Sequence, residues 1–322
     1  MSRVLNDYPD VAPETRARVL EAIRTAGFVP DRTARSLVTG RGQVIAVILE
    51  TGRGHPDLLH PFFQEVLMGL RRSVSASAYD LLLLSTPGDG LTYERRIRHH
   101  RVDGVLLMGA RGSDPGIAEI LAAGVPCMAV DLDVHGRRAG SISSDNVEGA
   151  ALAVRHLHTL GHRRIALIGG PLDTKPGADR LAGFRREVAW LGLQPHPAYE
   201  REGDFYPESG QAAMNALLDL PEPPTGVVAA SDLMAAGAIQ AVATRGLRVP
   251  ADVAVVGFDD IQLAELLRPP LTTIRQDKQG LGAVAADALL ALIADHEAEA
   301  PVVTLPVELI VRESTGVRLL EG

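Results

Sequence analysis

The sequence predicts an α/β protein in which a small helical head precedes two parallel-sheet lobes. Three observations support this fold class. From Gln43 onward, short apolar runs alternate with helical patterns, which is typical of a parallel sheet covered by helices on both faces. The alternation restarts at Asn146, which predicts a second lobe. Before Gln43 there are only helix and turn signals.

The head contains one clear helix and one short one. Pro13 stands at a first helical position, and the pattern continues to a stop at Gly27. Asp31 is placed to cap a second helix that runs to about residue 38, with Gly40 after it. So short a helix is marginal in water. We therefore expect it to form only when it is packed against something.

The lobes are expected from the apolar runs and the helical patterns between them. In the first lobe we expect strands at 44–49, 79–85, 102–108, 125–130 and 141–144, with helices at 61–76, 91–100 and 114–123. In the second we expect strands at 163–168, 202–205, 227–230 and 253–257, with helices at 146–160, 177–191, 207–220 and 233–245. A last strand, helix and strand, at 272–276, 281–296 and 302–311, are placed to complete both sheets. This requires the chain to cross between the lobes more than once.

Composition narrows the class of protein. Of the 322 residues, 46% are apolar and only 4% aromatic, so a large core is available. The net charge of −8 argues against nonspecific binding of nucleic acid by the whole chain. Residues 1–42 nevertheless hold seven arginines against five acids, which suits contact with a polyanion at one end.

The expected cellular location follows from the absence of disulfide, transmembrane and signal-peptide patterns in the sequence. Cys127 is the only cysteine, in an apolar run, so no disulfide can form within one chain. No apolar run reaches transmembrane length, and the N-terminus does not have the pattern of a secretion signal. We expect a cytoplasmic protein with no membrane contact.

Open parallel sheets bind ligands at the carboxyl ends of their strands, so a cleft between the lobes is the expected site. Carboxylates and an arginine suit vicinal hydroxyls or ring nitrogens, and aromatic faces suit the apolar side of a sugar or base. For each residue, a helix cap or a surface salt bridge is the alternative, above all for Asp232 and Asp260. The candidate effector-binding residues are His60, Phe62, Asp131, Arg180, Phe205, Ser231 and Asp259.

No catalytic or metal site is predicted. Gly169-Gly170-Pro171 follows a strand but matches neither the dinucleotide nor the GxxxxGK[ST] pattern, so a plain turn is favoured. The ten histidines show no HExxH pair, and no GxSxG elbow occurs. We expect neither a cofactor nor a catalytic residue.

Several collinear blocks carry a family resemblance. The stretch 161–171, GHRRIALIGGP, and 180–184, RLAGF, are similar to the lactose/galactose-repressor (LacI/GalR) family of bacterial transcription regulators. Further blocks that agree lie at 144–146, 203–210, 231–235, 248–250, 255–260 and 270–274. The resemblance covers essentially the whole chain.

This resemblance implies a domain organisation. It implies a partial helix-turn-helix head over 1–28, a hinge helix over 29–42 and an effector core over 43–322 like that of periplasmic sugar-binding proteins. The first lobe would comprise 43–145 plus about 275–305, and the second 146–274 plus about 306–322. Partners would be operator DNA, a small effector and a second copy, as a homodimer or a dimer of dimers. Residues 67–70 are expected in the main dimer surface.

The head departs from the family pattern. Family members have about twenty further residues, and Met1 stands where they usually have valine. We expect a start codon assigned too late, with a real truncation as the alternative. By resemblance, Arg3 contacts DNA, Leu37 is the wedge inserted into the minor groove, and Arg32 and Arg35 meet phosphates. Asp31, where asparagine is common, fits a capping role better.

In the core, the resemblance assigns Asp131, Arg180 and Asp259 to the effector, and Phe205 and Ser231 more loosely. Residues 60–63, HPFF, favour a sugar, with a nucleobase as the alternative. Effector binding would change lobe closure and hence the spacing of the paired hinges. A solute-binding protein without a DNA role would share the lobes but would need an export signal. The sequence fixes neither the sign of the response nor the operator.

Overall fold

The computed structural model describes residue 4 and residues 11–26, 41–49, 60–84, 92–111, 115–194 and 196–316. It divides into two units, 1–43 and 44–322. In the first unit, helix α2 (Pro13–Thr25) begins with the expected proline, and none of its residues is buried. Arg3, Arg32, Arg35 and Leu37 lie outside the described residues, as does the expected hinge helix.

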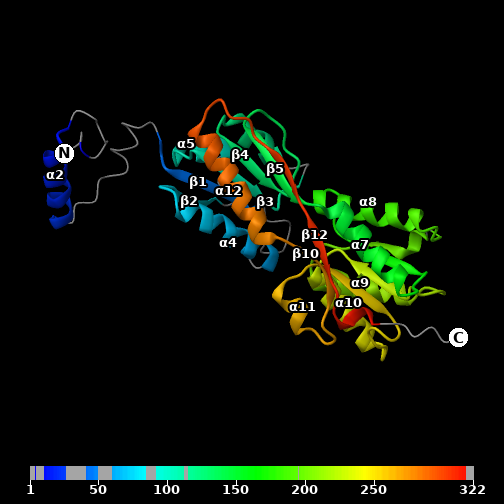
Figure 1. Ribbon diagram of the computed structural model, residues 1–322. Helices are drawn as coiled ribbons and strands as arrows, with labels where there is room; N and C mark the ends of the chain where they lie inside the picture. Colours follow the sequence, from blue (N-terminus) through cyan, green and yellow to red (C-terminus); the bar gives the residue numbers. More distant parts are fainter. Residues whose placement is uncertain are drawn as a thin grey trace. The chain divides into compact units, whose positions relative to one another are not determined.

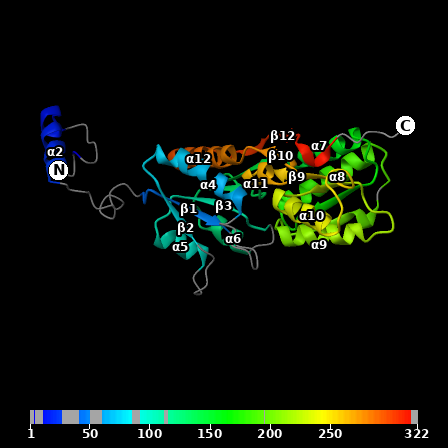
Figure 2. The ribbon, with the colours of Figure 1, turned by 90° about the horizontal axis from the view of Figure 1, so that it is seen from below.

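The first lobe is a six-stranded parallel sheet in the order β11-β5-β4-β3-β1-β2 (Figure 1). Its strands are β1 (Val44–Leu49), β2 (Asp80–Leu84), β3 (Gly104–Met108), β4 (Cys127–Val130), β5 (Ala139–Ser144) and β11 (Val302–Leu305). Helices α4 (Pro61–Ser75) and α12 (Lys278–Ala294) cover one face, and α5 (Tyr93–His99) and α6 (Pro115–Ala122) the other (Figure 2).

Strand β1 shows why this sheet needs two layers of helices. Ile45, Val47 and Leu49 pack on the side of α4 and α12, whereas Ala46 and Ile48 pack on the side of α5. Successive side chains of a strand point to opposite faces, so a continuous apolar run buries both. All five are at most 4% exposed.

The second lobe is built in the same way, with the order β12-β10-β9-β8-β6-β7. Its strands are β6 (Ile165–Gly169), β7 (Glu200–Glu202), β8 (Gly226–Ala229), β9 (Ala254–Asp259), β10 (Thr272–Gln276) and β12 (Val307–Ile310). Helices α7 (Asn146–Thr159) and α8 (Lys175–Trp190) pack on one face, and α9 (Pro207–Leu218) and α10 (Asp232–Thr244) on the other. The short helix α11 (Gln262–Leu266) follows β9.

The chain passes between the lobes at three places: after β5, after β10 and after β11. At the third place, the structure corrects the expectation of one strand over 302–311. Pro306 divides it into β11, parallel to β5 in the first sheet, and β12, antiparallel to β10 in the second. Proline cannot donate a ladder hydrogen bond, so the strand is interrupted there and the chain changes sheet.

Helices α4 and α12 pack unusually closely. A Cβ added to Gly69 would lie 1.9 Å from the Gln279 carbonyl oxygen, and one added to Gly282 would lie 1.9 Å from the Val66 carbonyl oxygen. The backbones of the two helices therefore approach each other directly at these glycines. The expected dimer surface is corrected in part, because Leu70 is fully buried in this packing, while Met68 is 54% exposed. Among the described helices, none is long and apolar enough to cross a membrane.

Candidate functional site

A cavity of about 170 Å³ lies between the two lobes, at the carboxyl ends of their strands. The first lobe contributes the start of α4 and the segments that follow β3 and β4. The second contributes the start of α8, the segment after β7 and the end of β9. The lining residues are His60, Phe62, Phe63, Gly109, Ala110, Arg111, Asp131, Pro171, Thr174, Pro176, Arg180, Asp204, Phe205, Tyr206 and Asp259.

Arg180, in the second turn of α8, is the buried cation of the cavity. Its guanidinium carbon lies 3.7 Å from the centre of the Phe258 ring. Its Nε donates to Asn146 Oδ1 at 2.8 Å, and Nη1 donates to the Ala230 carbonyl. Burial lowers the pKa of Arg180, and the carboxylates of Asp259 and Asp131 oppose this effect. A buried guanidinium held so firmly is preorganised to donate to a ligand.

Asp259 ends β9 with a φ of +115°, a strained value for a residue with a side chain. Its Oδ1 accepts from Gln276 Nε2 at 2.7 Å and lies 3.7 Å from Arg180 Nη1. Burial raises the pKa of Asp259, and Arg180 opposes this. Because 3.7 Å is too long for a hydrogen bond, the two groups attract without saturating each other. Both can still bond to a ligand.

Asp131 and His60 bring one acceptor and one donor from the first lobe. Asp131 Oδ1 is buried and has no partner among the described residues, and burial raises the pKa of this carboxyl to about 6. His60 Nδ1 accepts from the Phe62 amide at 3.3 Å, which places the proton of the neutral ring on Nε2. Burial lowers the pKa of His60. Its Nε2 also has no partner in the described part of the chain.

Two aromatic rings, Phe62 and Phe205, supply apolar surface. Phe205 has a φ of +71° and packs against Gly170, where an added Cβ would lie 2.2 Å from the ring. Gly170, directly after β6, therefore makes room for an aromatic side chain. His60 meets Tyr206 edge to face, with ring centres 5.5 Å apart. This contact between two lining residues joins the two lobes.

Comparison with known proteins decides the family. Residues 154–315 match the model of the periplasmic binding protein-like domain. The chain is 36% identical to the HTH-type transcriptional regulator CelR of Thermobifida fusca over 98% of its own length and 93% of that protein's. It is also 36% identical to the ribose operon repressor of Escherichia coli K12, covering 90% of this chain and 87% of the repressor.

Solved structures agree. A CelR–cellobiose complex is 34% identical, with a TM-score of 0.78 over 97% of this chain and 94% of that one. The lac repressor dimer bound to operator and the anti-inducer ONPF is 31% identical, with a TM-score of 0.83 over 98% and 94%. The chain belongs to the LacI family of transcriptional regulators. The relatives compared are regulators rather than enzymes.

Within this LacI-family regulator, six of the seven predicted effector residues line one cavity, and Ser231 does not. Ser231 is the N-cap of α10, where its hydroxyl accepts from the Met234 amide at 3.1 Å. The same hydroxyl donates to the Phe205 carbonyl at 3.1 Å. Ser231 therefore contacts the backbone of Phe205 and holds that residue in position.

The two other acids differ from Asp259. Asp232 is not the cap of α10; it is buried and accepts from the Ile261 amide at 2.8 Å and the Thr273 hydroxyl at 2.5 Å. Asp260 pairs at 2.7 Å with both Arg275 and Arg312, outside the cavity. Both acids therefore have structural partners.

Sequence reasoning missed Phe63, Thr174, Tyr206 and Arg111. The first and third are neighbours of chosen aromatic residues, and Arg111 follows β3 as Asp131 follows β4, so the rule of strand ends could have found it. Arg111 forms an ion pair across the cleft with Asp173, at 2.6 Å. Lys175 makes a similar cross-lobe pair with Asp133, at 3.3 Å. These partially exposed pairs join the two lobes across the cleft.

Proposed function

We propose that this chain is a transcriptional repressor that binds operator DNA through its N-terminal head and is controlled by a sugar bound between the lobes. The observation that carries the effector assignment is the set of groups facing the cavity. Arg180 is a donor, Asp259 and Asp131 are acceptors, and His60 presents a donor. A sugar hydroxyl both donates and accepts, so it can satisfy both kinds of group at once.

The aromatic rings complete the case for a sugar. Phe62 and Phe205 offer flat apolar faces to the C–H side of a pyranose or furanose. A relative of known structure, CelR, is complexed with cellobiose. The second candidate is a nucleobase, because aromatic rings also stack on bases. In addition, the HTH-type transcriptional repressor PurR of Pasteurella multocida is 32% identical over 99% of this chain.

The mechanism follows from the position of the cavity. Its residues belong to both lobes, so an effector that contacts both sets favours one degree of closure. In a homodimer, lobe rotation changes the spacing of the two segments that lead to the heads. A coupling of about 1–3 kcal/mol would change operator affinity by roughly 5–150-fold.

Isothermal titration calorimetry of the full chain with cellobiose, ribose and guanine tests the effector class. We expect a sugar to bind and Asp259→Asn or Arg180→Met to weaken it at least tenfold. Arg245→Gln is the matched control, because Arg245 pairs with Asp219 at the C-terminal ends of α10 and α9, away from the cavity residues. If guanine binds and neither sugar does, the effector is a nucleobase and the sugar assignment is wrong.

Operator control needs a second measurement. The full chain first selects duplex DNA from a random pool. The selected duplex is then labelled, and its binding to the protein is measured by fluorescence anisotropy with and without the effector. A rise in operator Kd defines an inducer and a fall defines a corepressor. An effector that binds the cavity and leaves operator Kd unchanged would remove the proposed coupling.

A further inference from the structure

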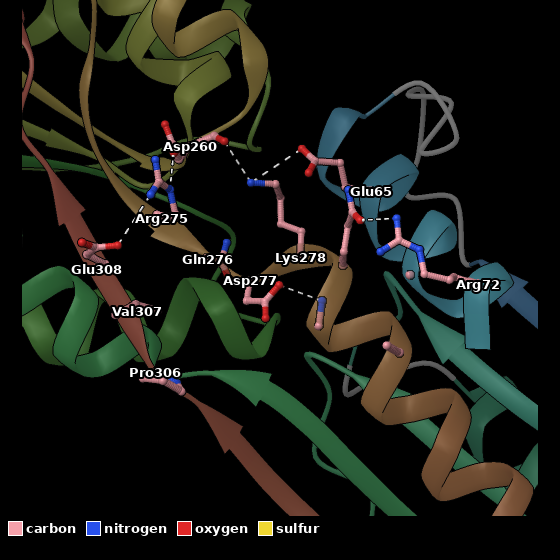
Figure 3. A pocket seen from close by; sticks show the side chains of 14 residues that line it. Glu65, Arg72, Asp260, Arg275, Gln276, Asp277, Lys278, Pro306, Val307 and Glu308 are labelled. Atoms are coloured by element: carbon pink, nitrogen blue, oxygen red, sulfur yellow. Dashed lines mark hydrogen bonds and ion pairs between the residues drawn. The ribbon is translucent and has the colours of Figure 1, made fainter.

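The segment that crosses from β10 to α12 carries a buried lysine, Lys278. It is the first residue of α12 and only 4% exposed. Its Nζ lies 2.6 Å from the Asp259 carbonyl oxygen and 2.9 Å from that of Asp260. It also lies 3.6 Å from Glu65 Oε1 on α4 (Figure 3). The ammonium group of Lys278 thus contacts both lobes, beside the groove that Figure 3 shows.

A lysine is an expensive choice at this position. Burial of an ammonium costs free energy unless it is paired and hydrogen-bonded. The first turn of a helix also repels cations, because the helix dipole places partial positive charge there. Two carbonyls and the Glu65 carboxylate offset both costs. For packing alone, an apolar residue of similar length would serve as well.

The two carbonyls belong to the strained end of β9. Asp259 and Asp260 have φ values of +115° and +54°, which side-chain-bearing residues seldom adopt. By binding both carbonyl oxygens, Lys278 holds this backbone in place. The direction of the Asp259 carboxylate depends on that backbone, and Gln276, two residues before Lys278, donates to the carboxylate itself. The crossover therefore fixes Asp259 from two sides.

The third contact leads back to the first lobe. Glu65 lies on α4, whose N-cap His60 and first-turn residue Phe62 line the cavity. The backbone of Lys278 belongs to α12, which packs closely on α4 at Gly69 and Gly282. When the lobes rotate, Lys278 moves with α4 while its carbonyl partners move with β9. All three contacts are made in the lobe arrangement in which Arg111 and Asp173 also pair across the cleft.

We propose that Lys278 is a positioning residue that latches the closed arrangement and links Asp259 to α4. The role of the latch in effector response rests on the proposed function. Its effect on lobe closure does not, because it exists in the protein without effector. Removing the ammonium therefore opens the lobes even before any sugar is added, and it loosens Asp259 at the same time.

The test uses the full chain labelled with a donor and an acceptor dye at Ala118→Cys on α6 and Ala212→Cys on α9, both exposed positions. The native Cys127 is fully buried and escapes labelling. Single-molecule energy transfer then gives the distribution of lobe separations without ligand. Lys278→Met keeps the length of the side chain and removes its charge. Glu65→Gln removes only the contact to α4.

The matched control is Arg72→Gln. Arg72 lies on α4 beside the same groove (Figure 3), and it donates to Gln279 of the same lobe. We expect the closed population to fall at least threefold in Lys278→Met, to fall less in Glu65→Gln, and to stay at the wild-type level in Arg72→Gln. A purely structural lysine would lower the melting temperature without moving this distribution.

A wild-type distribution in Lys278→Met would overturn the proposal. If that variant does not fold, Glu65→Gln decides alone, because Glu65 is partly exposed and its substitution leaves the carbonyl contacts intact. An unchanged distribution there refutes the link to α4. A failure of cellobiose to bind any variant would count against the sugar effector and leave the ligand-free result standing.

Discussion

Replacing Asp131 by asparagine should stabilise the core while weakening effector binding. Burial raises the pKa of this carboxyl from its ordinary value of 3.8 to about 6, even though Arg180 and Lys175 attract the ionised form. A raised carboxyl pKa means that ionisation costs the folded state stability, and this cost grows as pH rises from 3.8 to 6 and is constant above. At neutral pH it amounts to about 3 kcal/mol, and at pH 5 to roughly half of that.

The assay is urea unfolding of wild type and Asp131→Asn from pH 5 to pH 8. We expect the variant to gain up to about 3 kcal/mol at pH 8 and about half as much at pH 5. Asp219→Asn, on an exposed carboxylate, is the control and should show no such gain. A difference between variant and wild type that stays constant with pH, or a loss of stability, would refute the reasoning. Effector affinity should fall about tenfold or more, because a charged acceptor is lost.

The remaining predictions concern helix packing, a helix cap and an ion pair across the cleft. Gly69→Ala should lower the free energy of unfolding by about 1–3 kcal/mol, measured in urea, because its Cβ would collide with the Gln279 carbonyl. Ser231→Ala should lower the free energy of unfolding by about 1 kcal/mol, because the cap of α10 is lost. It should also weaken effector binding, measured by titration calorimetry, because the Phe205 carbonyl loses its bond to the hydroxyl. Arg111→Gln should speed effector release by roughly 1.5- to 5-fold in stopped flow, and 0.5 M NaCl should remove the difference.

Much of the fold could be predicted because its determinants are local. The run 44–49 is apolar at every position, and only a strand covered on both sides buries such a run. Helix starts such as Pro13, Pro61 and Asn146 were found because proline and capping residues act on the turn they begin. The principal cavity residues Asp131, Arg180 and Asp259 were found because strand ends of parallel sheets share one edge, together with the family resemblance.

Local sequence patterns did not show which of several neighbouring polar residues at a strand end faces the cleft. Ser231, Asp232, Asp259 and Asp260 all stand near strand ends, and spacing alone does not say which carboxylate turns into the cleft, although the family resemblance favours Asp259. Their partners decide it, since Asp232 is used by Thr273 and Ile261, and Asp260 by Arg275 and Arg312. The arginines and Thr273 come from segments up to about fifty residues away, beyond the reach of a helical or strand period.

By itself the sequence determined two tandem α/β lobes, the polar residues at their strand ends and the resemblance to LacI-family regulators, because periodicity, caps and motifs are properties of short segments. Only the tertiary structure decided that Pro306 divides a strand between two sheets, that Leu70 is core, and that Lys278 bonds to both lobes. These features depend on which distant groups meet. A buried charge such as Lys278 is tolerated where partners from separate segments converge, here the end of β9 and helix α4.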